Sequence, residues 1–144
     1  MTGRGRRMAM SLVGAVVLAG GCKLNNLALG IDDGDAGPQS GMVVVSLITP
    51  NTDDGAIRLT VNGPQVNTPQ SATGAYVVFS RQVSQQVVDV IVVGDLVTGA
   101  LIDIPVADMN RADEYRVSVA QVADRSDTLR TSLTGYAATV TPAN

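Results

Sequence analysis

The chain of 144 residues is long enough for one domain, or for one small domain with appendages. Hydrophobic residues make up 45% and charged residues 16%, which indicates a globular chain with a core, and the 3% of aromatic residues leaves most packing to valine and other aliphatic side chains. Histidine is absent and the net charge is −3, which argues against histidine-based catalysis or metal binding and against a nucleic-acid partner, whose phosphates require Lys and Arg patches.

The first 22 residues have the three-part layout of a secretory signal peptide. Met1–Arg7 is short and positively charged, Met8–Ala19 is twelve residues without a charge, and Gly20 and Gly21 precede Cys22, the only cysteine. The apolar run is too short for a membrane span, which needs about 20 residues. The alternative is a short buried N-terminal helix with Cys22 in the core. Such a helix would have one apolar face, whereas this run is apolar or small all round.

The same residues resemble the signal of bacterial lipoproteins. That family prefers Leu at the third position before the cysteine, followed by small residues; here Ala19 and two glycines precede Cys22, and Leu18 stands one place further back. The resemblance implies cleavage between Gly21 and Cys22 and acylation of the Cys22 thiol with palmitate-type chains. The mature protein would then be exported and anchored to the outer or the cytoplasmic membrane of a bacterial cell envelope.

Residues 22–41 are expected to form the lipidated cysteine and a flexible linker. They are rich in Gly, and no helix or strand period survives in them. Asp32, Asp33 and Asp35 stand close together around a glycine, which is how a calcium-binding loop begins, but the later ligands of such a loop are missing. We therefore expect a solvated acidic linker, after a signal peptide over residues 1–21.

From residue 42 onward the chain alternates between apolar and polar residues. In residues 55–64, Ile57, Leu59 and Val61 alternate with polar side chains, which predicts a half-buried strand closed by a turn. Similar strands are predicted within residues 41–50, 75–82, 85–95, 99–108, 114–124 and 135–142. The other side chains expected to face the core are Val43, Val45, Leu47, Val88, Val90, Val92, Ile102, Ile104, Val106, Tyr115, Val117, Val119, Tyr136, Ala138 and Val140.

Residues 75–82 leave the inner face open, because either Val77 and Phe79 or Tyr76 and Val78 could point inward. Pro105 lies inside a predicted strand and indicates an edge position or a bulge, since proline cannot donate to a ladder. Residues 125–133 are expected to form an excursion or a short helical turn.

Seven short strands in about 100 residues predict an all-β fold, an antiparallel Greek-key β-sandwich over residues 42–144. The rhythm of "GAIRLTV", "VVDVIVVGDLVTGALIDIPV" and "YRVSVAQV" is similar to that of cohesin-like and immunoglobulin-like bacterial surface modules. The likeness implies a fold neighbourhood and assigns no binding residues. The core Trp and the Cys pair of true immunoglobulin domains are absent.

Paired carboxylates are the remaining option for acid–base chemistry. The pairs are Asp53 with Asp54, Asp108 with Asp113, and Asp124 with Asp127. Adjacent aspartates before a glycine are more typical of a turn. The loop "DMNRAD" supplies Asp108, Asn110 and Asp113, which could bind calcium together with backbone carbonyls, although a turn is the expected structure. We therefore name no catalytic residue, no resident metal and no cofactor.

The leading hypothesis is a non-catalytic, lipid-anchored module that binds an envelope protein or a polysaccharide, or helps to build the envelope. Exposed strand edges and loops would form its contact surface. A small hydrolase that uses Asp pairs and a calcium-dependent module are the alternatives. We expect contact with a membrane through the N-terminal lipid, and neither nucleic acid nor a small-molecule substrate as a partner.

Overall fold

Residues 37–143 are described by the computed structural model, and they fold into eight strands and one short 3₁₀ helix, η1 (Met109–Glu114). The strands are β1 (Gly41–Ile48), β2 (Asp54–Asn62), β3 (Gln70–Ser71), β4 (Val77–Ser84), β5 (Val87–Val93), β6 (Gly99–Val106), β7 (Arg116–Asp124) and β8 (Ala137–Pro142). Seven of them correspond to the predicted strands. The two-residue β3 lies between two predicted strands, in a stretch for which no strand was predicted.

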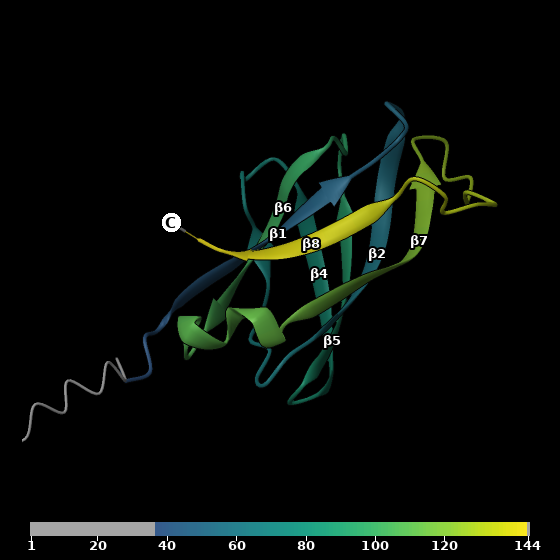
Figure 1. Cartoon of the computed structure of the whole chain (residues 1–144). Coiled ribbons are helices and arrows are strands. Elements are labelled where there is room, and N and C mark those ends of the chain that lie inside the picture. Colours follow the sequence, from purple (N-terminus) through teal and green to yellow (C-terminus); the bar gives the residue numbers. More distant parts are fainter. Residues whose placement is uncertain (1–36, 144) are drawn as a thin grey trace, which may run out of the picture. The chain divides into compact units, whose positions relative to one another are not determined.

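The strands form two four-stranded antiparallel sheets that face each other (Figure 1). The first sheet has the order β3-β6-β1-β8 and the second has the order β4-β5-β2-β7. β1 and β2 follow each other in the sequence but are inner strands of different sheets, so the chain crosses between the layers. The prediction of an all-β antiparallel sandwich is confirmed.

Aliphatic side chains from both sheets fill the space between the layers, as expected for facing sheets. Every residue of β1, β2, β5 and β6 that was expected to face inward is buried. Tyr115 is buried as well, while the expected residues of β7 and β8 are partly buried and pack against the core. The largest fully buried side chains are Leu47, Ile57, Leu59, Leu96, Leu101, Ile102 and Ile104.

The open question about β4 is settled by its pairing with β5. Val77 lies opposite Val93, and Phe79 lies opposite Ile91. Cross-strand partners project from the same face of a sheet, and the alternate residues of β5 are buried in the core. Val77 and Phe79 therefore point outward, whereas Tyr76 and Val78 pack against the core.

Pro105 was expected at an edge position or a bulge, but β6 lies between β3 and β1, and its pairing with β1 shows no register shift at Pro105. However, β3 pairs only with Asp103 and Ile102, so it does not extend to Pro105. The Asn67 side-chain amide donates to the Pro105 carbonyl at 2.8 Å instead. The missing N–H of proline is tolerated because the neighbouring strand ends before it.

Residues 125–133 form an excursion between β7 and β8. The Arg130 amide donates to the Val122 carbonyl at 2.8 Å, and the Asp124 amide donates to the Thr128 carbonyl at 3.0 Å. A helical turn occurs instead in η1, at Met109–Glu114, where the sequence predicted a simple turn.

Candidate interaction surface

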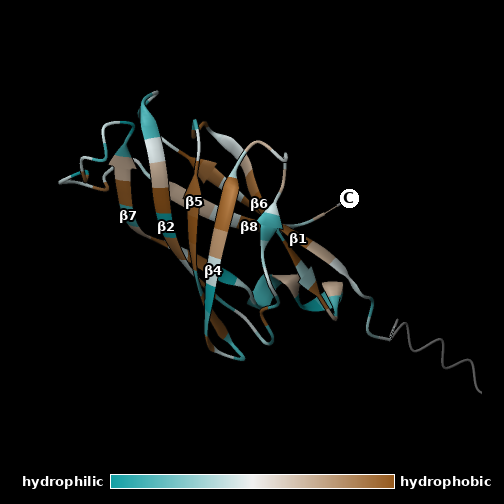
Figure 2. Cartoon of the chain, turned by 180° about the vertical axis from the view of Figure 1, so that it is seen from behind, coloured by the Kyte–Doolittle hydropathy of each residue, from teal (hydrophilic) through white to brown (hydrophobic). Residues whose placement is uncertain are grey.

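The outer face of the second sheet carries exposed apolar side chains on two neighbouring strands. Val77 and Phe79 of β4 are 56% and 59% exposed, and Ile91 and Val93 of β5 are 44% and 39% exposed. They form two cross-strand pairs, Val77 with Val93 and Phe79 with Ile91. Figure 2 shows this hydrophobic half of β4, with a hydrophilic half further along the strand.

The apolar surface continues across the remaining strands of the sheet. Ala56 of β2 lies opposite both Val93 of β5 and Ala123 of β7. Leu129, which is 57% exposed, forms an isolated bridge with Ala123. We call Val77, Phe79, Ile91, Val93 and Leu129 the apolar patch. Contiguous exposed apolar surface on a soluble domain is often a binding site.

A charged group borders the apolar patch. The Oδ2 atom of Asp89 accepts hydrogen bonds from the Nη2 atoms of Arg81 at 2.9 Å and of Arg58 at 3.0 Å, and its Oδ1 atom accepts one from Thr60 Oγ1 at 3.0 Å. The bonds from Arg81, Thr60 and Arg58 lower the pKa of Asp89. Two guanidinium groups share one carboxylate, which leaves an excess of one positive charge.

This positive charge stands out because residues 37–143 are acidic as a whole, with six arginines against ten carboxylates. The Arg81 side chain is 75% exposed, so its guanidinium remains accessible to a partner while it contacts Asp89. An anionic group is therefore attracted to this part of an otherwise acidic domain.

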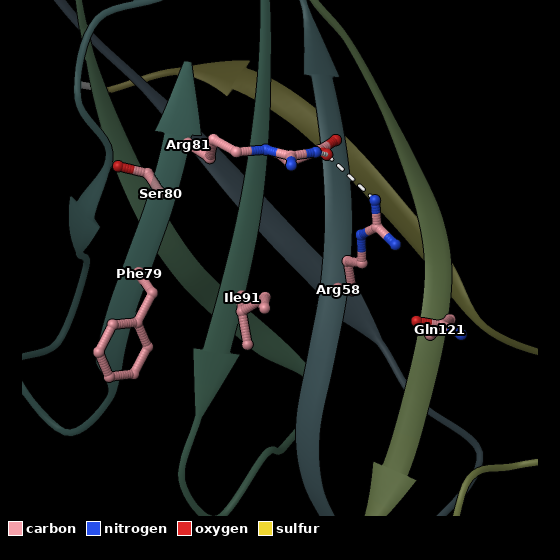
Figure 3. A pocket seen from close by; sticks show the side chains of 7 residues that line it. Arg58, Phe79, Ser80, Arg81, Ile91 and Gln121 are labelled. Carbon is pink, nitrogen blue, oxygen red and sulfur yellow. Dashed lines mark hydrogen bonds and ion pairs between the residues drawn. The ribbon is translucent and has the colours of Figure 1, made fainter. Parts of the chain in front are cut away.

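The apolar and charged groups meet in a shallow depression of about 430 Å³ on the outer face (Figure 3). Arg81 and Arg58 extend toward each other across the sheet, and Phe79 and Ile91 lie on neighbouring strands further along. The residues that line the depression are Arg58, Phe79, Ser80, Arg81, Asp89, Ile91 and Gln121. Such a surface offers apolar contact and a cationic contact side by side.

β4 is an edge strand, and β5 is its only hydrogen-bonded neighbour within the described part. An edge strand presents backbone N–H and C=O groups that no second strand pairs. The ladder between β4 and β5 is regular from Val77 to Gln82, and a register shift follows between Gln82 and Ser84. The regular part of the edge therefore coincides with the part that contributes Phe79 and Arg81 to the outer face.

The weak calcium candidates lie at η1, where Asp108 caps the helix. Its Oδ1 atom accepts hydrogen bonds from the backbone amides of Asn110 at 3.0 Å and of Gln39 at 3.2 Å. The Asn110 side-chain amide donates to the Gly37 carbonyl at 3.5 Å, and Asp113 accepts a hydrogen bond from Arg116 through its backbone carbonyl. Over residues 37–143, no group of three or more His, Cys, Asp or Glu side chains is placed so that it could hold a metal ion.

The carboxylate pair Asp124 with Asp127 belongs to the turn after β7. The Oδ1 atom of Asp124 accepts hydrogen bonds from the amides of Ser126 at 2.8 Å and Thr128 at 3.0 Å, which is a side-chain-stabilised turn. Asp127 has a φ of 60°, a left-handed conformation that Asp tolerates better than most residues.

The carboxylate pair Asp53 with Asp54 differs from the expected turn. Asp54 begins β2 and is fully buried, and its carboxylate accepts hydrogen bonds from Thr49 Oγ1 at 2.5 Å, from the Tyr136 hydroxyl at 2.8 Å and from Arg130 Nε at 2.9 Å. Arg130 also pairs with Asp53. No pattern in the sequence indicates this contact, because Asp54 and Arg130 are 76 positions apart.

Several predicted sites lie outside the described residues. These are Gly21 and Cys22 of the cleavage and lipidation site, and Asp32, Asp33 and Asp35 of the linker. Within residues 37–143, no helix has the length and the apolar character that a membrane span requires.

No protein-family model matches the chain, and neither a curated protein nor a solved structure is significantly similar to it.

Proposed function

We propose that the chain is a non-catalytic module of the bacterial cell envelope that is anchored through lipid on Cys22 and binds another macromolecule through the outer face of the second sheet. The observation that carries the binding role is the apolar patch beside the Arg58–Asp89–Arg81 group. Apolar side chains that are about half exposed, on the rigid face of a sheet, favour contact with a partner.

The anchoring part of the proposal rests on the sequence. Cys22 follows a positive segment, an apolar run of twelve residues and two glycines, and no other cysteine is present. Two or three acyl chains hold a protein firmly on a membrane, because each buried CH₂ contributes about 0.8 kcal/mol. The protein would then be exported and would face the periplasm or the cell surface.

Replacing Cys22 with serine tests the anchor. We expect the native chain to incorporate a labelled palmitate analogue and to lack residues 1–21 in its intact mass. The Cys22→Ser chain should keep those residues and take up no label. A native chain that retains residues 1–21 and carries a free thiol would contradict the proposed anchor.

A photo-crosslinking amino acid tests the binding face in intact envelopes. We expect benzoylphenylalanine at position 79 to form a discrete covalent adduct. The control is benzoylphenylalanine at position 48, because Ile48 is also exposed but belongs to β1 of the first sheet. The same adducts from both positions, or none from position 79, would contradict binding through this face.

A further inference from the structure

We propose that the partner binds as an extended polypeptide segment that pairs with the free edge of β4 and places a carboxylate beside Arg81 and apolar side chains beside Phe79 and Val77. The inference rests on the proposed function, since it names the chemistry of the partner at the same surface. The geometry of the edge, the order of its side chains and the local charge carry the argument.

The free backbone edge favours a polypeptide over other ligands. β4 is extended over eight residues, and its side away from β5 has no strand partner in the described part. Only another backbone supplies the alternating N–H and C=O groups that complete such an edge. A lipid or a glycan could cover the apolar patch but would leave the edge unpaired.

The side chains of β4 specify what the added strand should carry. The side chains of every second residue of β4, Val77, Phe79 and Arg81, lie on the outer face. Their partners on β5 are Val93, Ile91 and Asp89, which project from the same face. Residues on adjacent strands contact their direct neighbours on the same face. An antiparallel segment with the order acidic, any residue, apolar, any residue, apolar would place its carboxylate at Arg81 and its apolar side chains at Phe79 and Val77.

The local charge selects the acidic residue. The Asp89 carboxylate already accepts hydrogen bonds from both Arg81 and Arg58. Arg81 therefore shares this carboxylate with Arg58, and most of its side chain is exposed to solvent. A second carboxylate on the partner would balance the excess positive charge. A lysine at the same position would be repelled, so charge gives the edge selectivity as well as attraction.

Two fluorescent nonapeptides test the proposal by anisotropy titration against the full chain in mild detergent, with detergent alone as the blank. The first is Ser-Thr-Asp-Thr-Val-Thr-Val-Thr-Ser, and the second has Lys in place of Asp. We expect the full chain to bind the Asp peptide at least about tenfold more tightly than the Lys peptide. This corresponds to about 1.4 kcal/mol.

Charge reversal on the protein locates the contact. The Arg81→Glu variant should reverse the preference and bind the Lys peptide more tightly. The matched control is Arg125→Glu, because Arg125 is likewise exposed and ion-paired, with Asp95, but lies after β7 and outside the depression. This control should keep the original preference.

Loss of the aromatic side chain separates apolar contact from charge. Phe79→Ser should weaken the binding of both peptides about tenfold. Val97→Ser, at an exposed position between β5 and β6, should leave both affinities unchanged.

Three outcomes would overturn the inference: no binding of the Asp peptide at millimolar concentration, equal binding of both peptides, or an unchanged preference in Arg81→Glu. If position 79 still crosslinks in envelopes while the peptides fail, the binding face stands and the partner is not an acidic strand.

Discussion

Asp54 is a fully buried carboxylate that accepts hydrogen bonds from three other side chains. Burial by itself raises the pKa of Asp54, but hydrogen bonds from Thr49, Tyr136 and Arg130, together with the charge of Arg130, outweigh it and lower the pKa below its ordinary value. The hydrogen bond to Asp54 in turn raises the pKa of Arg130. These contacts join the start of β2 to the excursion before β8, so a single carboxylate ties together segments distant in sequence.

Replacing Asp54 with asparagine should lower the free energy of unfolding by about 3 kcal/mol, because it removes one partner of a buried ion pair and leaves the other. Urea unfolding at neutral pH measures the difference. The matched control is Asp95→Asn, whose ion pair with Arg125 is exposed and should matter by less than about 0.5 kcal/mol. Equal effects of the two substitutions would contradict a stabilising role for the buried pair.

The pH dependence follows from the lowered pKa of Asp54. The folded-state pKa lies below the ordinary value of 3.8, so the stabilisation is fully present above that ordinary, unfolded-state value and is lost as the pH falls through the folded-state pKa. The difference in unfolding free energy between the native chain and Asp54→Asn should therefore be constant from pH 7 to about pH 5. Below about pH 4 it should narrow, and a difference that widens there would contradict the assignment.

At the scale of single elements, β1 shows how alternation determines burial. Leu47 is 1% exposed, whereas its neighbour Ile48 is 50% exposed. Both are large aliphatic residues in one strand, so the pleat and not the residue type decides which of them enters the core. The same periodicity allowed most inward-facing residues to be assigned from the sequence.

The adjacent pair provides a matched test. Leu47→Ala should destabilise the fold by about 3 kcal/mol, because it removes buried methyl groups and leaves a cavity. Ile48→Ala should cost less than about 1 kcal/mol, since half of that side chain is already in water. Thermal or urea unfolding of both variants measures this, and a larger effect at position 48 would show that the register of β1 is wrong.

Alternation predicts a strand's inner face only when one of its two faces is polar. β2 and β5 contain Arg58 and Asp89, which mark the outer face, but both faces of the first half of β4 are apolar. The face of β4 therefore depended on its pairing with β5. The apolar patch was not predictable for the same reason, because it is assembled from strands whose neighbours the sequence does not reveal.

At the scale of the whole described domain, the outer face of the second sheet combines apolar and positively charged side chains. The second sheet carries the apolar patch and the excess positive charge, whereas acidic residues outnumber arginines over residues 37–143 as a whole. A net positive charge on a defined face of an otherwise acidic domain orients an approaching anionic partner before contact. The strand that contributes Arg81 to this face is also the one with a free edge.

The topology of the first sheet makes its stability depend on β8. β1 lies between β6 and β8, and β8 pairs only with β1. Deleting residues 137–144 should abolish cooperative unfolding, because it exposes one side of an inner strand and removes side chains that pack against the core. Deleting Asn144 alone should change little. Circular dichroism during urea titration distinguishes these outcomes, and a cooperative transition in the longer deletion would refute the dependence.

The position of β8 also has a temporal consequence. When the chain emerges from a ribosome or a narrow channel with its N-terminus first, about 90 residues separate the appearance of β1 from that of its second neighbour. Until then the first layer is incomplete, and pairings between such distant segments form slowly. The first sheet therefore completes its strand order only after β8 has emerged.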